Sequence, residues 1–423
     1  MRILWVTNQP IAQLRDMLGM SLGQSGGWME SAFYAIKDSS DFSLGIATIY
    51  LGTELLHATE DDHDFFAVPS KQYVGKYNPK DEYNLAQWRN VVGEYKPDVI
   101  QIWGTEYAIG LCAQLAAKGT PSVVYMQGQM SMIAKHCLDG IDVRTQICYS
   151  SLYELWKGKC MWMQKKKYRK AAIVEKEILS NAEAVIVESD WCGGICSMIS
   201  PKICVFKSDL PINPVFSTFD WDYCKIERNS IFTVSGGYPV KGHHILFDAL
   251  SIVKEEFPDV KLYIPGAIRL LRDLSFKEKI QLSSYDRYLS RQIKKYKLQD
   301  NIILLGKLTP QEMAAKMAVC HCFVMPSMIE NHSSSLIEAM MVGLPTISSF
   351  VGGLNSYYKD GENGFFYRAD EPEHLASLIV RYFKDETMCR KMACQGMISQ
   401  RSQRLSNNLK KDFEIIYKSV VKA

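Results

Sequence analysis

Short apolar runs alternate along this chain with longer segments in which apolar residues recur every three or four positions. The runs are rich in valine and isoleucine and predict strands over 3–7, 44–50, 99–103, 122–126, 184–187, 231–235, 260–264, 302–305, 322–325 and 345–348. The spacing between them predicts helices over 107–118, 243–256, 310–319 and 371–384, and a last amphipathic helix over 408–420. Uninterrupted apolar strands separated by helices are typical of parallel sheets covered on both faces.

Two such series of strands predict an α/β protein with two doubly wound, Rossmann-like domains. The segment 209–216 holds two prolines, which forbid a regular helix and favour an extended connector. We therefore expect an N-terminal domain over 1–208, a C-terminal domain over 209–400 and a last helical segment over 401–423. Ligands of open parallel sheets bind beyond the carboxyl ends of the strands, so two such domains would face a central cleft lined by strand ends.

Composition and charge exclude several classes of protein. Of the 423 residues 47% are hydrophobic and 22% are charged, which excludes collagen, coiled coil and wholesale disorder. The 49 basic and 46 acidic residues leave a net charge of +3, too small for a dedicated nucleic-acid binder. No run of about 18 apolar residues predicts a membrane-spanning helix. The first residues predict a strand and not a signal peptide.

The 12 cysteines are scattered, without a Cys-x-x-Cys pair or metal-ligand spacing. Small buried hydrophobic positions explain most of them, so we expect a reducing, cytoplasmic setting. His136, His321 and His374 suggest no ligand cluster. No metal site is therefore expected.

The strongest candidate for chemistry lies in the second half, after the strand over 322–325. Glu330 stands in a loop, the serines Ser333, Ser334 and Ser335 open a helix, and Glu338 stands inside that helix. Serines cap helices well, and the first-turn N–H groups suit hydroxyl or phosphate ligands. A carboxylate inside an apolar helix is costly to bury without partners, and two carboxylates here suit polyol binding. The alternative is a surface Glu beside a helix and a second Glu paired with a basic residue.

A second candidate follows the strand over 231–235, where Gly236 and Gly237 precede Lys241 and a helix. A lysine at a helix N-terminus opposes the helix dipole and usually needs an anion. Together with the glycines and the helix N–H groups it forms a candidate diphosphate site. A solvated loop lysine is the alternative, and the order of a Walker A loop is absent.

Three further candidates lie in the first half. Gly26 and Gly27 precede a helix and let the backbone approach a ligand, or they form a plain turn. Their spacing does not match Gly-x-Gly-x-x-Gly, which counts against a nicotinamide dehydrogenase. Two strands end at Trp103, with Glu106 beyond it, and at Gln127. Glu106 and Gln127 would project into the cleft, or these segments serve only as caps and turns.

Residues 156–170 mix Trp and Met with seven basic residues. Such a mixture suits an anionic membrane surface. The alternative is a solvated helix face with its tryptophans anchored in the core.

In this order and spacing the motifs resemble the retaining, nucleotide-sugar-dependent glycosyltransferases of family 4, which have the GT-B fold. The Glu-x7-Glu element is Glu330 to Glu338, and 343–347, 351–353 and 360–364 look like the family's ensuing loops. The resemblance runs from Met1 to the last helix and is strongest over 231–368. It also implies that the last helix packs back on the N-terminal domain.

The resemblance implies roles for these residues. Lys241 and the Gly27 N–H would bind the donor diphosphate, and Gly26, Gly236 and Gly237 would line the same donor site. Glu330 would contact the transferred sugar, the amides near Ser333, Ser334 and Ser335 the sugar or phosphate, and Glu338 the ribose. Glu106 and Trp103 would lie on the acceptor side. The expected catalytic residues are Lys241, Glu330 and Gln127.

The chain departs from the family pattern at two positions. Many relatives have Arg five residues before the lysine, where this chain has Gly236, so the second phosphate cation is missing or comes from elsewhere. Many also have His where this chain has Gln127. Gln cannot titrate, so Gln127 would hydrogen-bond a sugar without acting as a base.

The resulting hypothesis is sugar transfer, with retention, from a nucleoside diphosphate sugar to an acceptor hydroxyl, in surface glycan or polysaccharide synthesis. The donor is a substrate, and no cofactor or metal is expected. The acceptor would be a saccharide or a lipid-linked saccharide, with peripheral contact to an anionic membrane at the inner face of the cell membrane. A sugar-nucleotide epimerase, a non-catalytic nucleotide-sugar-binding protein and a nicotinamide oxidoreductase remain as alternatives.

Overall fold

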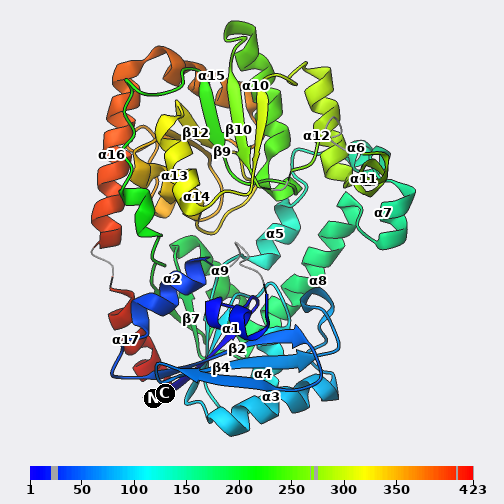
Figure 1. Cartoon of the computed structure of the whole chain (residues 1–423), viewed down its shortest axis with the longest axis vertical. Helices are drawn as coiled ribbons and strands as arrows, with labels where there is room; N and C mark the ends of the chain where they lie inside the picture. The colour runs from blue at the N-terminus through cyan, green and yellow to red at the C-terminus, as the bar shows by residue number, and fades with distance from the viewer. Residues whose placement is uncertain (21–26, 267, 271–274, 406–407, 423) are drawn as a thin grey trace. The chain divides into compact units, whose positions relative to one another are not determined.

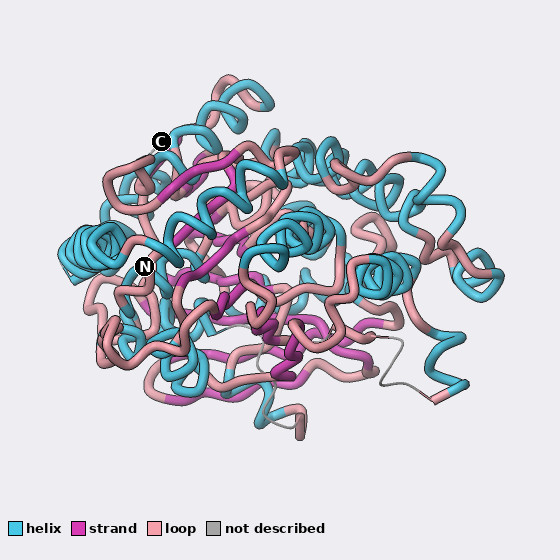
Figure 2. Tube along the Cα trace, turned by 90° about the horizontal axis from the view of Figure 1, so that it is seen from above, coloured by secondary structure: helices cyan, strands magenta, loops and turns pink. Residues whose placement is uncertain are grey.

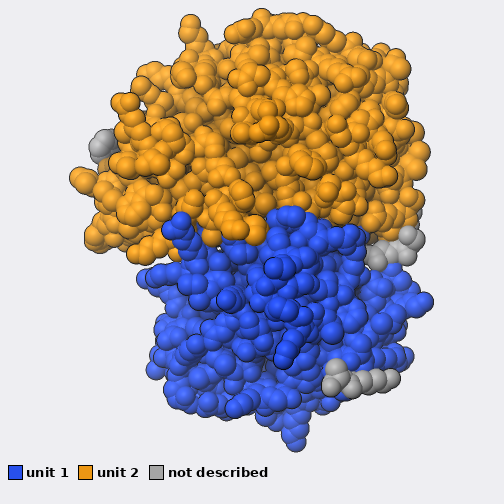
Figure 3. Space-filling model, turned by 180° about the vertical axis from the view of Figure 1, so that it is seen from behind, with its two compact units in different colours: residues 1–131, 168–211, 407–423 blue, residues 132–167, 212–406 orange. Residues whose placement is uncertain are grey.

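The computed structural model describes residues 1–20, 27–266, 268–270, 275–405 and 408–422. Its elements are labelled in Figure 1, and Figure 2 distinguishes helices, strands and loops. The chain divides into two compact units (Figure 3). Unit 1 comprises Met1–Ser131, Tyr168–Pro211 and Asn407–Ala423, and unit 2 comprises Met132–Lys167 and Ile212–Ser406.

The division at Pro211 falls within the proline-containing connector. The units differ from the expected domains in the segment Met132–Lys167, which belongs to unit 2 although it precedes the connector. Buried polar contacts explain this. The carboxylate of Glu154 accepts hydrogen bonds from a guanidinium nitrogen of Arg287 at 2.5 Å and from the Ser284 N–H at 2.6 Å.

The sheet of unit 1 has the strand order β3-β4-β2-β1-β5-β6-β7-β8. Its strands are β1 (Arg2–Thr7), β2 (Ser43–Leu51), β3 (Leu56–Glu60), β4 (His63–Ser70), β5 (Val99–Trp103), β6 (Ser122–Tyr125), β7 (Ala184–Val187) and β8 (Cys204–Lys207). All neighbours are parallel except β3 and β4. The five strands predicted in this half are confirmed. Three strands of this sheet, β3, β4 and β8, were not predicted. The edge strands β3 and β8 are largely exposed and lack a long apolar run, whereas β4 is mostly buried and was missed.

Helices cover both faces of this sheet because its buried strands are apolar on both sides. Leu4 and Val6 pack in one core with helices α3 (Glu82–Tyr95), α4 (Ile109–Ala116), α8 (Met161–Ser180) and α9 (Asp190–Ile199). Ile3 and Trp5 pack in the other core with α1 (Ala12–Met17), α2 (Gly27–Ile36) and α17 (Leu409–Lys422). The helix α5 (Met130–His136) follows β6. Successive side chains of β1 therefore point to opposite faces of the sheet and pack in two separate cores.

The last helix, α17, belongs to the core of unit 1. The Trp5 indole N–H donates to the Tyr417 hydroxyl at 3.1 Å, and that hydroxyl donates to Gln101 Oε1 at 2.5 Å. Phe413 is fully buried beside them. These contacts join residues more than 300 positions apart in the chain.

The sheet of unit 2 is parallel throughout and has the strand order β11-β10-β9-β12-β13-β14. Its strands are β9 (Ser230–Thr233), β10 (Lys261–Pro265), β11 (Ile302–Gly306), β12 (Cys322–Met325), β13 (Thr346–Ser349) and β14 (Phe365–Tyr367). Its helices are α6 (Val143–Cys148), α7 (Leu152–Lys157), α10 (His243–Glu256), α11 (Phe276–Gln281), α12 (Ser284–Lys295), α13 (Pro310–Val319), α14 (Ser334–Val342), α15 (Pro372–Lys384) and α16 (Glu386–Leu405). The five strands and three helices predicted here are confirmed. Both units are thus doubly wound α/β folds, as expected.

Candidate functional site

In unit 2 the loops after β9 and β12 meet at the carboxyl edge of the sheet. Lys241 ends a short 3-10 helix, Pro239–Lys241, that precedes α10, and its Nζ lies 2.6 Å from Glu330 Oε1. The Ser327 hydroxyl donates to the same carboxylate oxygen at 2.7 Å. The side chains of Lys241 and Glu330 are 22% and 13% exposed. Lys241 and Glu330 therefore form one partly buried ion pair.

The backbone brings these two loops together. Strands β9 and β12 are parallel neighbours, so their carboxyl ends lie side by side. Gly242 has φ +66°, and a Cβ there would lie 1.7 Å from the carbonyl oxygen of Pro326. The Met328 N–H donates to the carbonyl of Val240 at 2.7 Å. Only glycine fits the close approach at position 242.

The helix α14 begins directly after the loop that carries Glu330. The Ser333 hydroxyl is the N-cap and accepts a hydrogen bond from the Leu336 N–H at 3.3 Å. Ser334 and Ser335 form the first turn, whose N–H groups have no partner within the helix. These groups and the helix dipole suit an anionic or hydroxyl ligand.

Glu338 lies within α14 and is half-buried. No described residue donates a hydrogen bond to its carboxylate or forms an ion pair with it. Burial raises the pKa of Glu338 to about 7. The alternative considered for this residue, a Glu paired with a basic side chain, is therefore not found among the described residues, and the carboxylate remains available to a ligand.

Gly236, which lies five residues before Lys241, packs against the imidazole of His243. A Cβ at position 236 would lie 2.3 Å from His243 Cε1. His243 is fully buried, with its Nε2 3.1 Å from the carbonyl oxygen of Val234, and burial lowers its pKa to about 3. His243 is therefore neutral at physiological pH. Lys241 is the only permanently charged cation within residues 235–245.

In unit 1, Glu106 lies beyond β5, as predicted, and Gln127 lies beyond the neighbouring strand β6. The Gly128 N–H donates to Glu106 Oε1 at 3.1 Å, and the side-chain amide of Asn8 donates to Oε2 at 3.4 Å. Burial raises the pKa of Glu106 to about 7. Asn8 was not predicted, although its position directly after the first strand is the same signal that identified Glu106.

The expectation for Trp103 is corrected by the structure. Its indole is 1% exposed and stacks on Tyr125 with ring centroids 4.9 Å apart, beside Phe413 of α17. Trp103 is therefore a core residue and does not reach an acceptor. The sequence shows that a strand ends here but not that α17 covers this face.

A buried glutamate of α8, Glu175, organises the loop after β6, and sequence reasoning did not identify it. Its carboxylate accepts hydrogen bonds, all within 2.7–3.0 Å, from the Thr105 hydroxyl, the Gln129 side-chain amide and the backbone N–H groups of Met130 and Ser131. Glu175 is fully buried. It holds the segment that follows Gln127 and Gly128 in one conformation.

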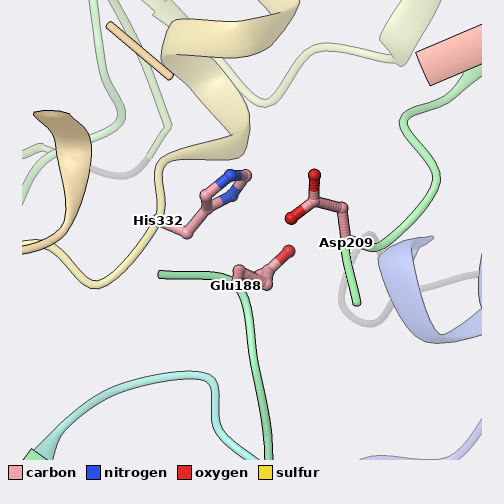
Figure 4. Close-up of side chains that lie close together, drawn as sticks. All are labelled: Glu188, Asp209 and His332. Atoms are coloured by element: carbon pink, nitrogen blue, oxygen red, sulfur yellow. The ribbon is translucent and has the colours of Figure 1, made fainter. Parts of the chain in front are cut away.

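Two more carboxylates of unit 1 follow β7 and β8. Oxygens of Glu188 and Asp209 lie within 4.8 Å of each other (Figure 4). Glu188 also accepts a hydrogen bond from the Leu210 N–H at 3.2 Å. Two carboxylates would hold a hard cation such as Mg²⁺ only with further oxygen ligands. His332, drawn in the same figure, belongs to unit 2, where its Nε2 lies 3.2 Å from a guanidinium nitrogen of Arg404.

Gly26, Gly27 and Gly237 were also predicted to line the donor site. Gly26 lies outside the described residues. Gly27 begins α2. Gly237 has φ +125°, with open space where a side chain would be.

The structure thus brings Lys241, Glu330 and the start of α14 to one edge of unit 2, and Glu106 and Gln127 to the corresponding edge of unit 1. Glu338 lies in α14, the helix that Ser333 caps. Trp103 is a core residue and is not part of the candidate site.

Comparison with known proteins gives a family match over 225–397, with the glycosyl transferases group 1. Mannosylfructose-phosphate synthase of Agrobacterium fabrum is 24% identical over 162 residues, 38% of this chain and 34% of that protein. N-acetyl-alpha-D-glucosaminyl L-malate synthase of Bacillus anthracis is 26% identical over 130 residues, 31% of this chain and 34% of that protein. The matched part thus spans about a third of the length of these relatives.

Solved structures resemble nearly the whole chain. Sucrose-phosphate synthase from Thermosynechococcus elongatus has a TM-score of 0.72 and 15% identity, covering 99% of this chain and 98% of that chain. Anabaena HepE in complex with UDP and glucose has a TM-score of 0.65 and 18% identity, covering 99% and 100%. These likenesses confirm the expected fold class.

Proposed function

We propose that the protein transfers a sugar from a nucleoside diphosphate sugar to an acceptor hydroxyl, because residues 225–397 match the family model of the group 1 glycosyl transferases. The observation that carries the proposal is the Lys241–Glu330 ion pair beside the N-terminus of α14. A cation, a carboxylate and a helix N-terminus at one sheet edge match the three parts of such a donor: diphosphate, sugar hydroxyls and further phosphate or sugar oxygens.

The roles proposed for these residues are those that the family resemblance implies, and the charge and position of each side chain are compatible with them. Lys241 binds the diphosphate, so an incoming donor replaces Glu330 as its partner and leaves that carboxylate to accept hydrogen bonds from the transferred sugar. Glu338, in its ionised form, accepts hydrogen bonds from the two ribose hydroxyls. In unit 1, Glu106 and Gln127 contribute to the acceptor side. Because HepE has been solved in complex with UDP-glucose, this sugar nucleotide is the first donor to test.

The proposed reaction proceeds with retention and without a metal. The bond between the anomeric carbon and the diphosphate oxygen breaks, and the acceptor oxygen bonds to the same face of that carbon. The acceptor proton passes to the departing phosphate oxygen, so no side-chain base is needed and Gln127 is compatible with turnover. Lys241 and the helix N–H groups stabilise the charge that develops on the leaving diphosphate.

The acceptor class follows from the proposed role in surface glycan or polysaccharide synthesis. We propose a saccharide or a lipid-linked saccharide, used on the cytoplasmic side of the cell membrane. Peripheral contact with that membrane is part of the proposal.

A thermal-shift screen of sugar nucleotides tests the donor. A ligand at about 100 times its Kd raises the free energy of unfolding by ~2.7 kcal/mol. The expected result is stabilisation by UDP-glucose or another sugar nucleotide, with acceptor-dependent release of nucleoside diphosphate that continues in EDTA. NMR of the product would give its anomeric configuration. Donor consumption without acceptor would instead indicate an epimerase, and binding without turnover over an acceptor panel would indicate a non-catalytic binding protein.

A further inference from the structure

Two short helices of unit 2 turn apolar side chains toward solvent. On α6, Val143 and Ile147 are 69% and 60% exposed, and they are spaced i, i+4 on one helix face. On α7, Leu152 and Trp156 are 86% and 75% exposed with the same spacing, and Leu155 beside them is also exposed. We call these five residues the α6–α7 surface.

The exposed face does not result from a loosely attached segment. Glu154, on the other side of α7, is buried and accepts hydrogen bonds from Arg287 and Ser284 of α12. Arg287 also donates from Nε to the carbonyl of Tyr149 at 3.1 Å, which ties the end of α6 to α12. Helices α6, α7 and α11 are neighbours in Figure 1, and α11 contacts α7. The polar side of α7 is thus fixed to unit 2, and its apolar side is left uncovered.

The segment that carries this surface is predominantly basic. Residues 143–167 contain six basic side chains, namely Arg144, Lys157, Lys159, Lys165, Lys166 and Lys167. The only acid in this segment is Glu154, which is neutralised by Arg287. Lys157 Nζ lies 4.1 Å from the centre of the Trp156 ring. Asp142, at the edge of the segment, is engaged as the N-cap of α6.

We propose that the α6–α7 surface docks the protein on an anionic lipid bilayer. Tryptophan favours the bilayer–water interface, and aliphatic side chains on the same face would enter the acyl boundary. The basic side chains would lie at the level of anionic headgroups, which attract them electrostatically. Among the described residues, no helix has both the length and the apolar character of a membrane span. The proposed contact is peripheral.

Charge decides between a bilayer and a second copy of the chain. Pairing two α6–α7 surfaces face to face would bring two sets of six basic side chains together, and like charges at an interface oppose association. A bilayer offers both an apolar interior and a negative surface. The occupant that satisfies both features of this surface is therefore an anionic membrane.

Flotation of the full chain with vesicles tests the inference. We expect binding to vesicles of equimolar phosphatidylcholine and phosphatidylglycerol that decreases as salt rises, and at least roughly tenfold weaker partitioning into pure phosphatidylcholine. The double variant Leu152→Ser/Trp156→Ser should lower partitioning into the mixed vesicles by roughly tenfold or more. The charge variant Lys157→Glu/Lys159→Glu should lower it comparably.

Matched control variants exist elsewhere on the surface. Met198→Ser removes an apolar side chain that is 84% exposed on α9, and Lys391→Glu reverses an exposed lysine on α16. Both should bind the mixed vesicles like the unaltered chain. Equal binding by the α6–α7 variants and the controls, or equal binding to neutral vesicles, would overturn the inference. Self-association that the Leu152→Ser/Trp156→Ser variant abolishes, in the absence of vesicle binding, would assign the surface to a second copy instead.

The inference extends the proposed function because it would bring the enzyme to a membrane-bound acceptor, but its test needs neither donor nor turnover. The Leu152→Ser/Trp156→Ser variant should keep the affinity for the donor and the rate with a water-soluble acceptor. If the unaltered chain catalyses transfer but does not bind vesicles, the docking inference is wrong and the proposed function stands. If it binds vesicles but does not catalyse transfer, the proposed function is wrong and the docking inference stands.

Discussion

The Lys241 ammonium and the Glu330 carboxylate lie 2.6 Å apart, although 89 positions separate them in the chain. The ammonium group is the proposed ligand of the donor diphosphate, and the carboxylate is the proposed ligand of the transferred sugar. In this structure the two groups bind each other. Binding of a diphosphate would exchange one anionic partner of Lys241 for another. The positive charge therefore stays compensated in both states, and the site is kept in place before the donor arrives.

Replacing Lys241 by Ala should lower kcat by roughly 10²–10³, because one preorganised charge that stabilises the leaving diphosphate is lost. Steady-state kinetics with saturating donor measures this effect. Lys359→Ala is the matched control, since Lys359 is 67% exposed in the same unit and pairs with Glu362. Near-normal turnover of the Lys241 variant with an intact fold would remove this lysine from the site.

Replacing Glu330 by Gln should separate diphosphate binding from sugar transfer. Without the competing carboxylate, Lys241 loses one anionic partner, so the affinity for the nucleoside diphosphate should rise by roughly fivefold, the scale of a partly exposed ion pair. Transfer should become slower because the sugar loses a charged hydrogen-bond acceptor. Calorimetric titration with UDP, compared with turnover of the sugar nucleotide, distinguishes the two effects. Weaker UDP binding in the variant would contradict a competition between Glu330 and the diphosphate.

Much of this site follows from the sequence because parallel strands end at one edge of a sheet. Lys241 follows β9 and Glu330 follows β12, and the apolar runs predict both strands. The direct ion pair depends on β9 and β12 being neighbours, which the strand order decides and a one-dimensional pattern does not contain. Gly242, which permits the approach, carries no distinctive signal by itself.

The failures have equally specific causes. Trp103 was assigned to the acceptor side because it ends a strand, but α17, some 300 residues later, covers that face. Met132–Lys167 was assigned to the first domain because it precedes the connector, but the buried Glu154 binds Arg287 in unit 2. Both errors arise from contacts between distant parts of the chain, which local apolar periodicity does not encode.

Replacing Gly236 by Ala should destabilise the protein, because the new methyl group would meet the buried His243 ring. Overpacking of this kind lowers the free energy of unfolding by about 1–3 kcal/mol. Denaturant unfolding measures it. In the control Gly194→Ala, on α9, the added methyl meets nothing within 4 Å, so the free energy of unfolding should hold or rise by about 0.5–1 kcal/mol. A fully stable Gly236 variant would mean that His243 yields easily and that a larger side chain is tolerated there.

Glu338 should make donor affinity and protein stability respond to pH in opposite directions. Its pKa is raised by burial from 4.5 to about 7, so between these pH values the folded protein keeps a proton that the unfolded chain has lost. Stability from this group is therefore greatest below the unfolded pKa and decreases as pH rises toward 7. Ribose binding needs the ionised carboxylate as acceptor, so the donor Kd should fall by about tenfold between pH 6 and pH 8.

The variant Glu338→Gln isolates these effects from those of Glu106, whose pKa is also raised to about 7. Glutamine does not titrate, so the variant should lose both the pH dependence of donor Kd and this residue's share of the pH dependence of stability. Its donor KM should exceed that of the unaltered protein at pH 8 and approach it at pH 6, while kcat changes little. Calorimetric Kd values and denaturant midpoints at both pH values provide the comparison. A variant with lower kcat but unchanged KM would show that Glu338 acts on the reaction step and not on the ribose.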